Sequence, residues 1–306
     1  MKAIKKTNII IALVVALIVS SCGGTTGTVP ITGRKQKLLV TDEQVLSLSN
    51  QQYTDYMKTA KPSTNATNTA MVKRVGQRLA TAVETYLRNN GLANETRYYS
   101  WEFNLVQENQ INAFCMPGGK IVVYEGILPV TQTEGALAIV LGHEIAHAVA
   151  KHSAERISND IRQQYGGQIL GAVLQGAGVS TDWQQIGSAA FGLGSKIGGA
   201  AYSRSQESEA DHLGLIFAAM AGYDPQVAVG FWQRMASASG GGSAGLFSDH
   251  PADATRIKNI QGWLPEAQRY YTGGKTNTTT KNNAGTKTTK KNTTKTPSTS
   301  GTIRIK

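Results

Sequence analysis

Two histidines and a glutamate stand in an otherwise apolar stretch, as His143-Glu144-Ile145-Ala146-His147. Because His143 and His147 are four residues apart, a helix would hold both imidazoles on one face, where they could bind one metal ion. Glu144 would point about 100° away from His143, within reach of a water at that metal. The pattern therefore predicts zinc-dependent hydrolysis with Glu144 as general base. Two core histidines satisfied by backbone or carboxylate partners are the alternative.

A catalytic zinc ion takes three protein ligands and leaves a fourth position open, so a further ligand must come from elsewhere in the chain. His152 follows His147 by five residues, which on one continuous helix turns it about 140° away. We therefore expect His152 to serve packing. The other candidates are His212, His250 and the carboxylates of the segment 203–214.

Within that segment, Glu207 and Asp211 are four residues apart and share one face of a predicted helix. One of them can bind the metal while the other accepts a hydrogen bond from an imidazole ring. Glu209 is expected to project from another face. A solvated acidic stripe is the alternative interpretation of the pair.

The HExxH stretch and the later segment Ser203-Arg204-Ser205-Gln206-Glu207-Ser208-Glu209-Ala210-Asp211 together resemble the zinc metallopeptidases that include HtpX, the Ste-type CAAX prenyl protease, BepA and LoiP. The resemblance covers roughly Pro30 to Tyr271. It implies an α+β, zincin-like (gluzincin) domain that is mainly helical, with Zn²⁺ as cofactor. It also implies Glu207 as the third zinc ligand, with Asp211 contacting the ligands rather than the zinc ion itself.

Two other stretches share this resemblance, Asn112-Ala113-Phe114 and His250-Pro251. An edge strand beside the metal could hold an extended peptide through backbone hydrogen bonds, so Asn112, Ala113 and Phe114 are expected to bind substrate. A purely structural strand is the alternative. The resemblance implies that His250 lies by the zinc and either assists catalysis or keeps the enzyme latent, against the alternative of a surface loop.

The elements that must position these residues can be predicted from periodicity. Apolar spacing indicates helices over 41–59, 69–89, 203–222 and 227–235, and a buried helix that carries the HExxH motif. Alternation of apolar and polar residues indicates a strand over 101–105, and the apolar run 121–124, entered through a Pro-Gly-Gly turn, indicates a second strand. Together they predict a small antiparallel sheet between helices. Residues 166–199 hold ten glycines; this insert is either a mobile lid or a pair of loosely packed helices.

The N-terminus has the layout of a secretory signal, with a basic start and an apolar run too short for a comfortable membrane span. Val19-Ser20-Ser21-Cys22 resembles a bacterial lipobox, so we expect a signal peptide over 1–21, lipidation of Cys22 and a tether over 22–40. An uncleaved anchor helix is the alternative. Only one other cysteine exists, Cys115, which excludes a disulfide framework and is expected to be a small buried residue.

The net charge of +11 does not indicate nucleic-acid binding, because of where the charge lies. Excess lysine and arginine are confined to the first six residues and to the chain after Gly274, and between them 20 Lys and Arg balance 20 Asp and Glu. Residues 273–306 are polar and basic, and we expect a disordered tail there.

These observations favour a zinc metalloendopeptidase domain over 41–272, lipid-anchored in a bacterial envelope and acting on misfolded or unassembled envelope proteins. Outer-membrane placement facing the periplasm is expected because Gly23, rather than aspartate, follows Cys22. Protein or peptide substrates and the membrane are the expected partners. A non-proteolytic lipoprotein scaffold is the alternative, although it would not need Glu144. A peptide deformylase would need a cysteine ligand, and Cys115 does not match that position.

Overall fold

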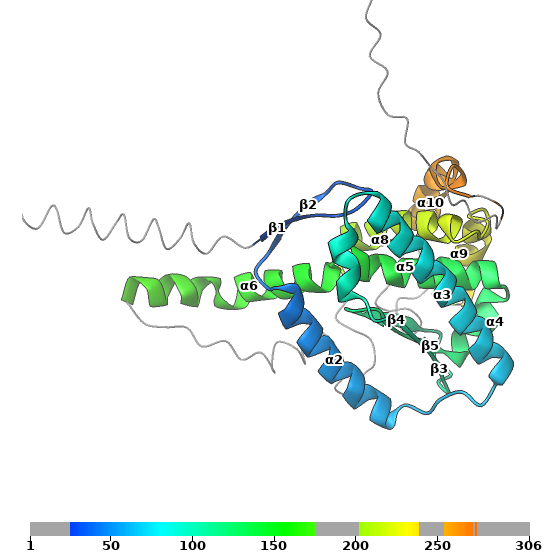
Figure 1. Cartoon of the computed structure of the whole chain (residues 1–306), viewed down its shortest axis with the longest axis horizontal. Coiled ribbons are helices and arrows are strands. Elements are labelled where there is room, and N and C mark those ends of the chain that lie inside the picture. The colour runs from blue at the N-terminus through cyan, green and yellow to red at the C-terminus, as the bar shows by residue number, and fades with distance from the viewer. Residues whose placement is uncertain (1–24, 176–201, 239–253, 272, 274–306) are drawn as a thin grey trace, which may run out of the picture. The chain divides into compact units, whose positions relative to one another are not determined.

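The computed structural model describes residues 25–175, 202–238, 254–271 and 273. Helices dominate these residues, together with two small sheets (Figure 1). Several predictions lie outside the described residues: the signal peptide at 1–21, Cys22, residues 176–199 of the glycine-rich insert, His250 and the tail from residue 274.

The helix with the HExxH motif, α5 (Glu134–Val149), is buried on all sides over most of its length. It begins where the hydroxyl of Thr133 accepts a hydrogen bond from the backbone N–H of Ala136. Because the helix is apolar all round, it can be stable only with other elements packed around it. Those elements include α3 (Ala66–Asn89), α8 (Arg204–Met220) and the three-stranded sheet.

Helices α5 and α8 cross at a pair of glycines, Gly142 and Gly214. A Cβ atom built on Gly214 would lie 2.5 Å from the backbone nitrogen of His143, and one on Gly142 would lie 2.6 Å from the carbonyl oxygen of Gly214. Only glycine allows the two backbones to approach so closely. The crossing brings the first half of α8, which carries Glu207, against the histidines of α5.

The three-stranded sheet has the order β3 (Glu102–Val106), β5 (Lys120–Tyr124), β4 (Ala113–Met116). Helix α3 packs against β3, and α5 packs against β4. The predicted fold class is confirmed, but the sheet is mixed in detail, since β4 pairs antiparallel with β5 and β3 pairs parallel with it. Among the described residues, β4 pairs only with β5, which leaves its other edge available.

Residues 25–38 form a hairpin of β1 (Thr25–Thr28) and β2 (Lys35–Leu38), which corrects the prediction of a tether up to residue 40. The turn of the hairpin inserts Arg34 between α8 and α6 (His152–Gln175), where the guanidinium group contacts Glu209 and Glu155. A segment with these buried polar contacts is part of the folded domain. A polar composition alone could not show this, because the partners are more than a hundred residues away.

The hydrophobic core has two clusters, a large one that contains residues of α5 and a smaller one that contains residues of α2 (Asp42–Thr59). The predicted helices and strands are confirmed, with shifts of a few residues at their ends. Within the described residues, no helix is long and apolar enough to cross a membrane. The remaining elements are η1 (Ala93–Tyr98), η2 (Glu125–Ile127), α4 (Leu128–Thr131), α9 (Val227–Ala238) and α10 (Ala254–Gln268).

Candidate metal centre

Helix α5 directs the imidazoles of His143 and His147 toward one point. Their Nε2 atoms lie 3.1 Å apart, and the residues are 2% and 1% exposed. Burial lowers the pKa of His147 well below its ordinary value, so this ring is neutral at pH 7. A neutral imidazole has the lone pair that a metal ion requires.

Glu207 on α8 faces the same point from the opposite side. Its carboxylate oxygens lie 3.4 Å from Nε2 of His147 and 3.5 Å from Nε2 of His143. Two imidazoles and one carboxylate are a known ligand set of catalytic zinc, and ligands of a tetrahedral zinc ion lie roughly 3.3 Å apart. The three side chains therefore fit a zinc ion with one position open. Among the residues that the structure describes, they are the one group of three suited to a metal.

Asp211, one turn after Glu207, lies behind His143. Its Oδ1 is 2.9 Å from Nδ1 of His143 and also accepts a hydrogen bond of 2.6 Å from Arg256. Burial lowers the pKa of His143, but the carboxylates of Asp211 and Glu207 outweigh it and raise this pKa to about 9. When Nε2 faces a metal, Nδ1 must carry the ring proton, and Asp211 is placed to accept it.

Arg256 comes from α10 and is 6% exposed. Its guanidinium group lies over the ring of Trp232, 3.4 Å from the centroid, besides its bond to Asp211. A planar cation held by an aromatic face and a carboxylate has little freedom to rotate. The sequence did not predict the contact of Arg256 with Asp211, because the two residues lie 45 positions apart on different helices.

Glu144 is 2% exposed and does not share the direction of the two histidines. Its charge acts on Cys115 in β4 and on Tyr202, since it contributes to raising the pKa of both side chains beyond the larger effect of burial. Cys115 is buried in the core, as predicted, and is a free cysteine.

The prediction for His152 is wrong. This residue does not face away: it is fully buried, and its Nδ1 lies 2.9 Å from Nδ1 of His147. The prediction assumed one continuous helix, whereas α5 ends at Val149 and α6 begins at His152 after a sharp corner. His152 is not a third ligand, because its ring touches the side of His147 that points away from Glu207.

Of two other ring side chains, Tyr202 contacts the metal centre and His212 does not. Tyr202 stacks on His147, with ring centroids 4.0 Å apart and planes inclined by 20°, a contact that no motif indicates. His212 points instead toward α10, where it bonds to Glu266 at 2.7 Å and stacks on Trp263. His212 is thereby excluded as a third ligand.

The predicted substrate strand coincides with the start of β4. Asn112 and Ala113 are buried, and the Asn112 side chain accepts a hydrogen bond from the backbone N–H of Ala113. The ring of Phe114 packs edge-on against Tyr56 and Tyr124. These side chains are occupied within the protein, so the group that β4 can offer to a peptide is its backbone edge.

A buried helix with HExxH, crossed by a helix that adds a carboxylate at the same point, defines a zincin-like metallopeptidase. The chain belongs to peptidase family M48, whose sequence profile matches residues 67–264. Family membership implies a metal-dependent peptidase with protein or peptide substrates.

Curated relatives of the chain include proteins named as metalloendopeptidases and as a metalloprotease. The chain is 39% identical over 171 residues to the mitochondrial metalloendopeptidase OMA1 of Schizosaccharomyces pombe, covering 55% of this chain and 48% of that one. It is 30% identical over 246 residues to human OMA1, covering 78% and 46%. It is 27% identical over 235 residues to metalloprotease LoiP of Escherichia coli, covering 74% and 82%. The chain thus spans about half the length of the OMA1 proteins that it matches.

Proposed function

We propose that this protein is a zinc-dependent metalloendopeptidase that cleaves misfolded or unassembled proteins of a bacterial envelope. The observation that carries the proposal is the convergence of His143, His147 and Glu207, three buried donors 3.1 to 3.5 Å apart. Within M48 this donor set has the composition of a zinc site with one open position. The similarity to LoiP and to a beta-barrel assembly-enhancing protease supports an envelope role.

The mechanism assigns each side chain one task. His143, His147 and Glu207 would hold the zinc ion, which supplies an electrophile for the scissile carbonyl and lowers the pKa of water. Glu144 takes the proton of the attacking water and passes it to the leaving amine. Asp211 keeps the Nδ1 proton of His143 in place, so that the lone pair of Nε2 stays directed to the metal.

The substrate would lie along the edge of β4, next to α5. A peptide added as a further strand is held by backbone hydrogen bonds, which tolerate many sequences. This suits an enzyme that removes misfolded proteins. Helix α5 packs against β4, so the helix that carries Glu144 lies next to the proposed peptide strand.

We further propose that residues 1–21 are a signal peptide and that Cys22 is lipidated and anchors the enzyme, with the outer membrane as its site. The lipobox-like sequence before Cys22 and Gly23 after it support this assignment. Membrane partitioning that persists after replacement of Cys22 by alanine would contradict the lipid anchor.

For His250 we propose a place beside the open metal position. Replacement of His250 by alanine should then change the rate of peptide hydrolysis in either direction, and an unchanged rate would contradict that place.

The decisive experiment is cleavage of casein or an unfolded outer-membrane protein by the purified protein. Hydrolysis should require zinc, stop with a chelator, and fall by several orders of magnitude in Glu144→Gln while zinc binding persists. Glu134→Gln is the matched control, since Glu134 lies on the same helix but pairs with Arg74 at the surface. Hydrolysis that survives in Glu144→Gln would refute the mechanism. A zinc-loaded wild type that cleaves neither substrate would favour the scaffold alternative.

A further inference from the structure

The ring of His147 has a hydrogen-bond partner, His152, to which the proposed metal site assigns no role. If Nε2 of His147 binds a metal, Nδ1 must carry the ring proton and act as a donor. The atom 2.9 Å from it is Nδ1 of His152, which can accept only if it carries no proton. The proton of His152 then resides on Nε2, and that atom lies 3.0 Å from a carboxylate oxygen of Glu209. The three side chains therefore form one directed series of hydrogen bonds.

The carboxylate of Glu209 is itself held from the N-terminal hairpin. The hydroxyl of Thr32 donates to one oxygen at 2.6 Å, and Nε of Arg34 donates to the other at 2.8 Å. The oxygen that accepts from Arg34 is also the one that lies 3.0 Å from Nε2 of His152. The carboxylate of Glu209 therefore joins His152 to the hairpin.

Arg34 is fixed in turn by a second carboxylate. Its two terminal nitrogens donate to the two oxygens of Glu155 at 2.7 and 2.9 Å, a bidentate pair. Gln206 of α8 also donates to Glu155 at 2.9 Å. The hairpin contacts the end of α5 as well, because the amide of Gln36 donates to the carbonyl of Ala150 at 2.6 Å. The guanidinium group that orients Glu209 is thus itself held by a residue of α6, which α8 also contacts.

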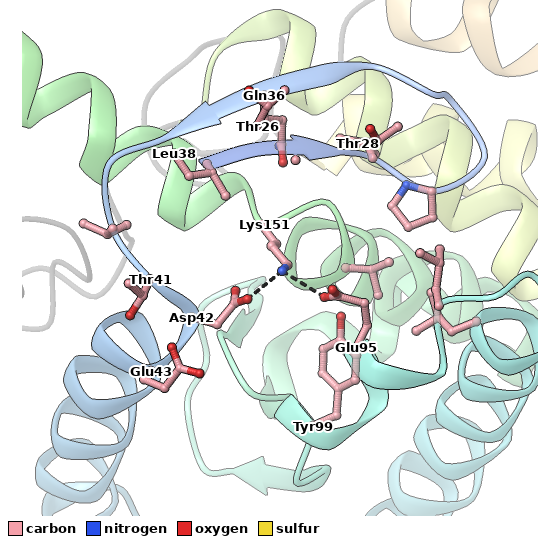
Figure 2. A pocket seen from close by; sticks show the side chains of 17 residues that line it. Thr26, Thr28, Gln36, Leu38, Thr41, Asp42, Glu43, Glu95, Tyr99 and Lys151 are labelled. Atoms are coloured by element: carbon pink, nitrogen blue, oxygen red, sulfur yellow. Dashed lines mark hydrogen bonds and ion pairs between the residues drawn. The ribbon is translucent and has the colours of Figure 1, made fainter. Parts of the chain in front are cut away.

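The corner between α5 and α6 brings His152 back to His147. It depends on Lys151, whose φ of 54° is left-handed and unfavourable for a residue with a side chain. The ammonium group of Lys151 makes ion pairs of 2.8 Å with both Asp42 and Glu95. Figure 2 shows Lys151 reaching between these two carboxylates beneath the hairpin. The pairs, with residues of α2 and η1, hold the break between the two helices that one continuous helix would not have.

We infer that His152 is a positioning residue of the metal site: it fixes the ring of the ligand His147, and Glu209 and Arg34 fix His152. The N-terminal hairpin is thereby part of the metal site, although it holds no ligand. This inference rests on the proposed zinc site. Both metal histidines would then have a carboxylate partner, Asp211 directly for His143 and Glu209 through His152 for His147.

The test measures zinc affinity by competition with a chromophoric chelator, on variants that circular dichroism shows to be folded without metal. His152→Phe fills the site without an acceptor, and we expect its Kd for zinc to rise 10- to 100-fold. His152→Asn restores an acceptor near the position of Nδ1 and should recover part of the affinity. His212→Phe is the matched control, since His212 contacts α10 and not the metal centre, and its Kd should stay unchanged.

A second pair of variants tests the hairpin. Arg34→Gln should weaken zinc binding several-fold, whereas Lys35→Gln should not, because Lys35 bonds only to Thr28 within the hairpin in the described structure. The visible absorption bands of the cobalt-substituted protein should change in His152→Phe, since they report ligand geometry and not folding.

The outcomes separate the two proposals. A merely structural His152 would lower the melting temperature without metal but leave the zinc Kd and the cobalt spectrum unchanged, and that result would overturn the inference. If Arg34→Gln leaves the zinc Kd unchanged while His152→Phe raises it, His152 positions His147 without help from the hairpin. If His152→Phe weakens zinc binding but the wild type hydrolyses no protein, the proposed peptidase function fails while the positioning role stands. A wild type that binds no zinc overturns both.

Discussion

Replacing Gly214 by alanine should damage both the fold and the metal site, because this residue lies where α5 and α8 touch. The added Cβ would be 2.5 Å from the backbone nitrogen of His143 and 2.7 Å from the carbonyl carbon of Gly142. Neither atom can move without moving α5. Ordinary contact begins near 3.4 Å, so the helices must separate by about 1 Å, and overpacking of this kind costs about 1–3 kcal/mol.

The size of the effect follows from two opposing terms. Alanine is favoured over glycine inside a helix by about 1 kcal/mol, which partly offsets the clash. We therefore expect Gly214→Ala to lower the free energy of unfolding by about 1 kcal/mol. The loss of metal affinity should be larger, because zinc ligands tolerate displacements of only about 0.2 Å. A shift of α8 carries Glu207 away from His143 and His147, and the zinc Kd should rise on the order of tenfold or more.

Gly262→Ala is the matched control for this prediction. Gly262 also lies within a helix, but a Cβ atom there would meet nothing within 4 Å. It should stabilise the protein by up to about 1 kcal/mol and leave zinc binding unchanged. Urea unfolding and competitive zinc titration of both variants provide the measurement. If Gly214→Ala gained stability like Gly262→Ala and bound zinc as the wild type does, the close crossing would not position the ligands.

Three other predictions concern the corner, an ion pair and the metal. Lys151→Gly should be more stable to urea than Lys151→Ala by about 1 kcal/mol, because both variants lose the ion pairs but only glycine accepts the left-handed backbone at low cost; equal stabilities would contradict this. Burial raises the pKa of Glu155, but hydrogen bonds from Arg34 and Gln206 outweigh it and lower the pKa below 4.5. Its contribution is therefore complete above about pH 4.5 and is lost as the pH falls further. In urea unfolding, the difference in stability between the wild type and Glu155→Gln should stay constant down to about pH 4.5 and shrink below it, and a difference that does not shrink would refute the assignment. With free zinc at about a hundred times its Kd, removal of the zinc should lower the free energy of unfolding by about 2.7 kcal/mol. An unchanged melting temperature would show that the site holds no metal in the folded state.

Sequence reasoning predicted the parts of the centre that depend on spacing within one helix. His143 and His147 meet because any α-helix brings residues four apart onto one face, and the same rule puts Glu207 and Asp211 on one side of α8. The family resemblance then chose Glu207 as the ligand, and the structure places its carboxylate opposite both histidines. The strand at 101–105 followed from alternation, since a half-buried strand repeats every two residues. The strand at 121–124 followed from its apolar run after the turn at 117–119, which suits a strand buried on both faces.

The positions of His152, Arg256 and the N-terminal hairpin were decided only by the tertiary structure. Helical periodicity turned His152 away from His147, but the helix breaks at Lys151, whose ammonium group is held by carboxylates of α2 and η1. No local pattern encodes that break, since the partners of Lys151 are 56 and 109 residues away along the chain. The period of the helix, which can be followed in the sequence alone, thus determined which side chains could bind a metal. The packing of distant segments determined what orients them, because an ion pair acts through space and leaves no spacing rule in the chain.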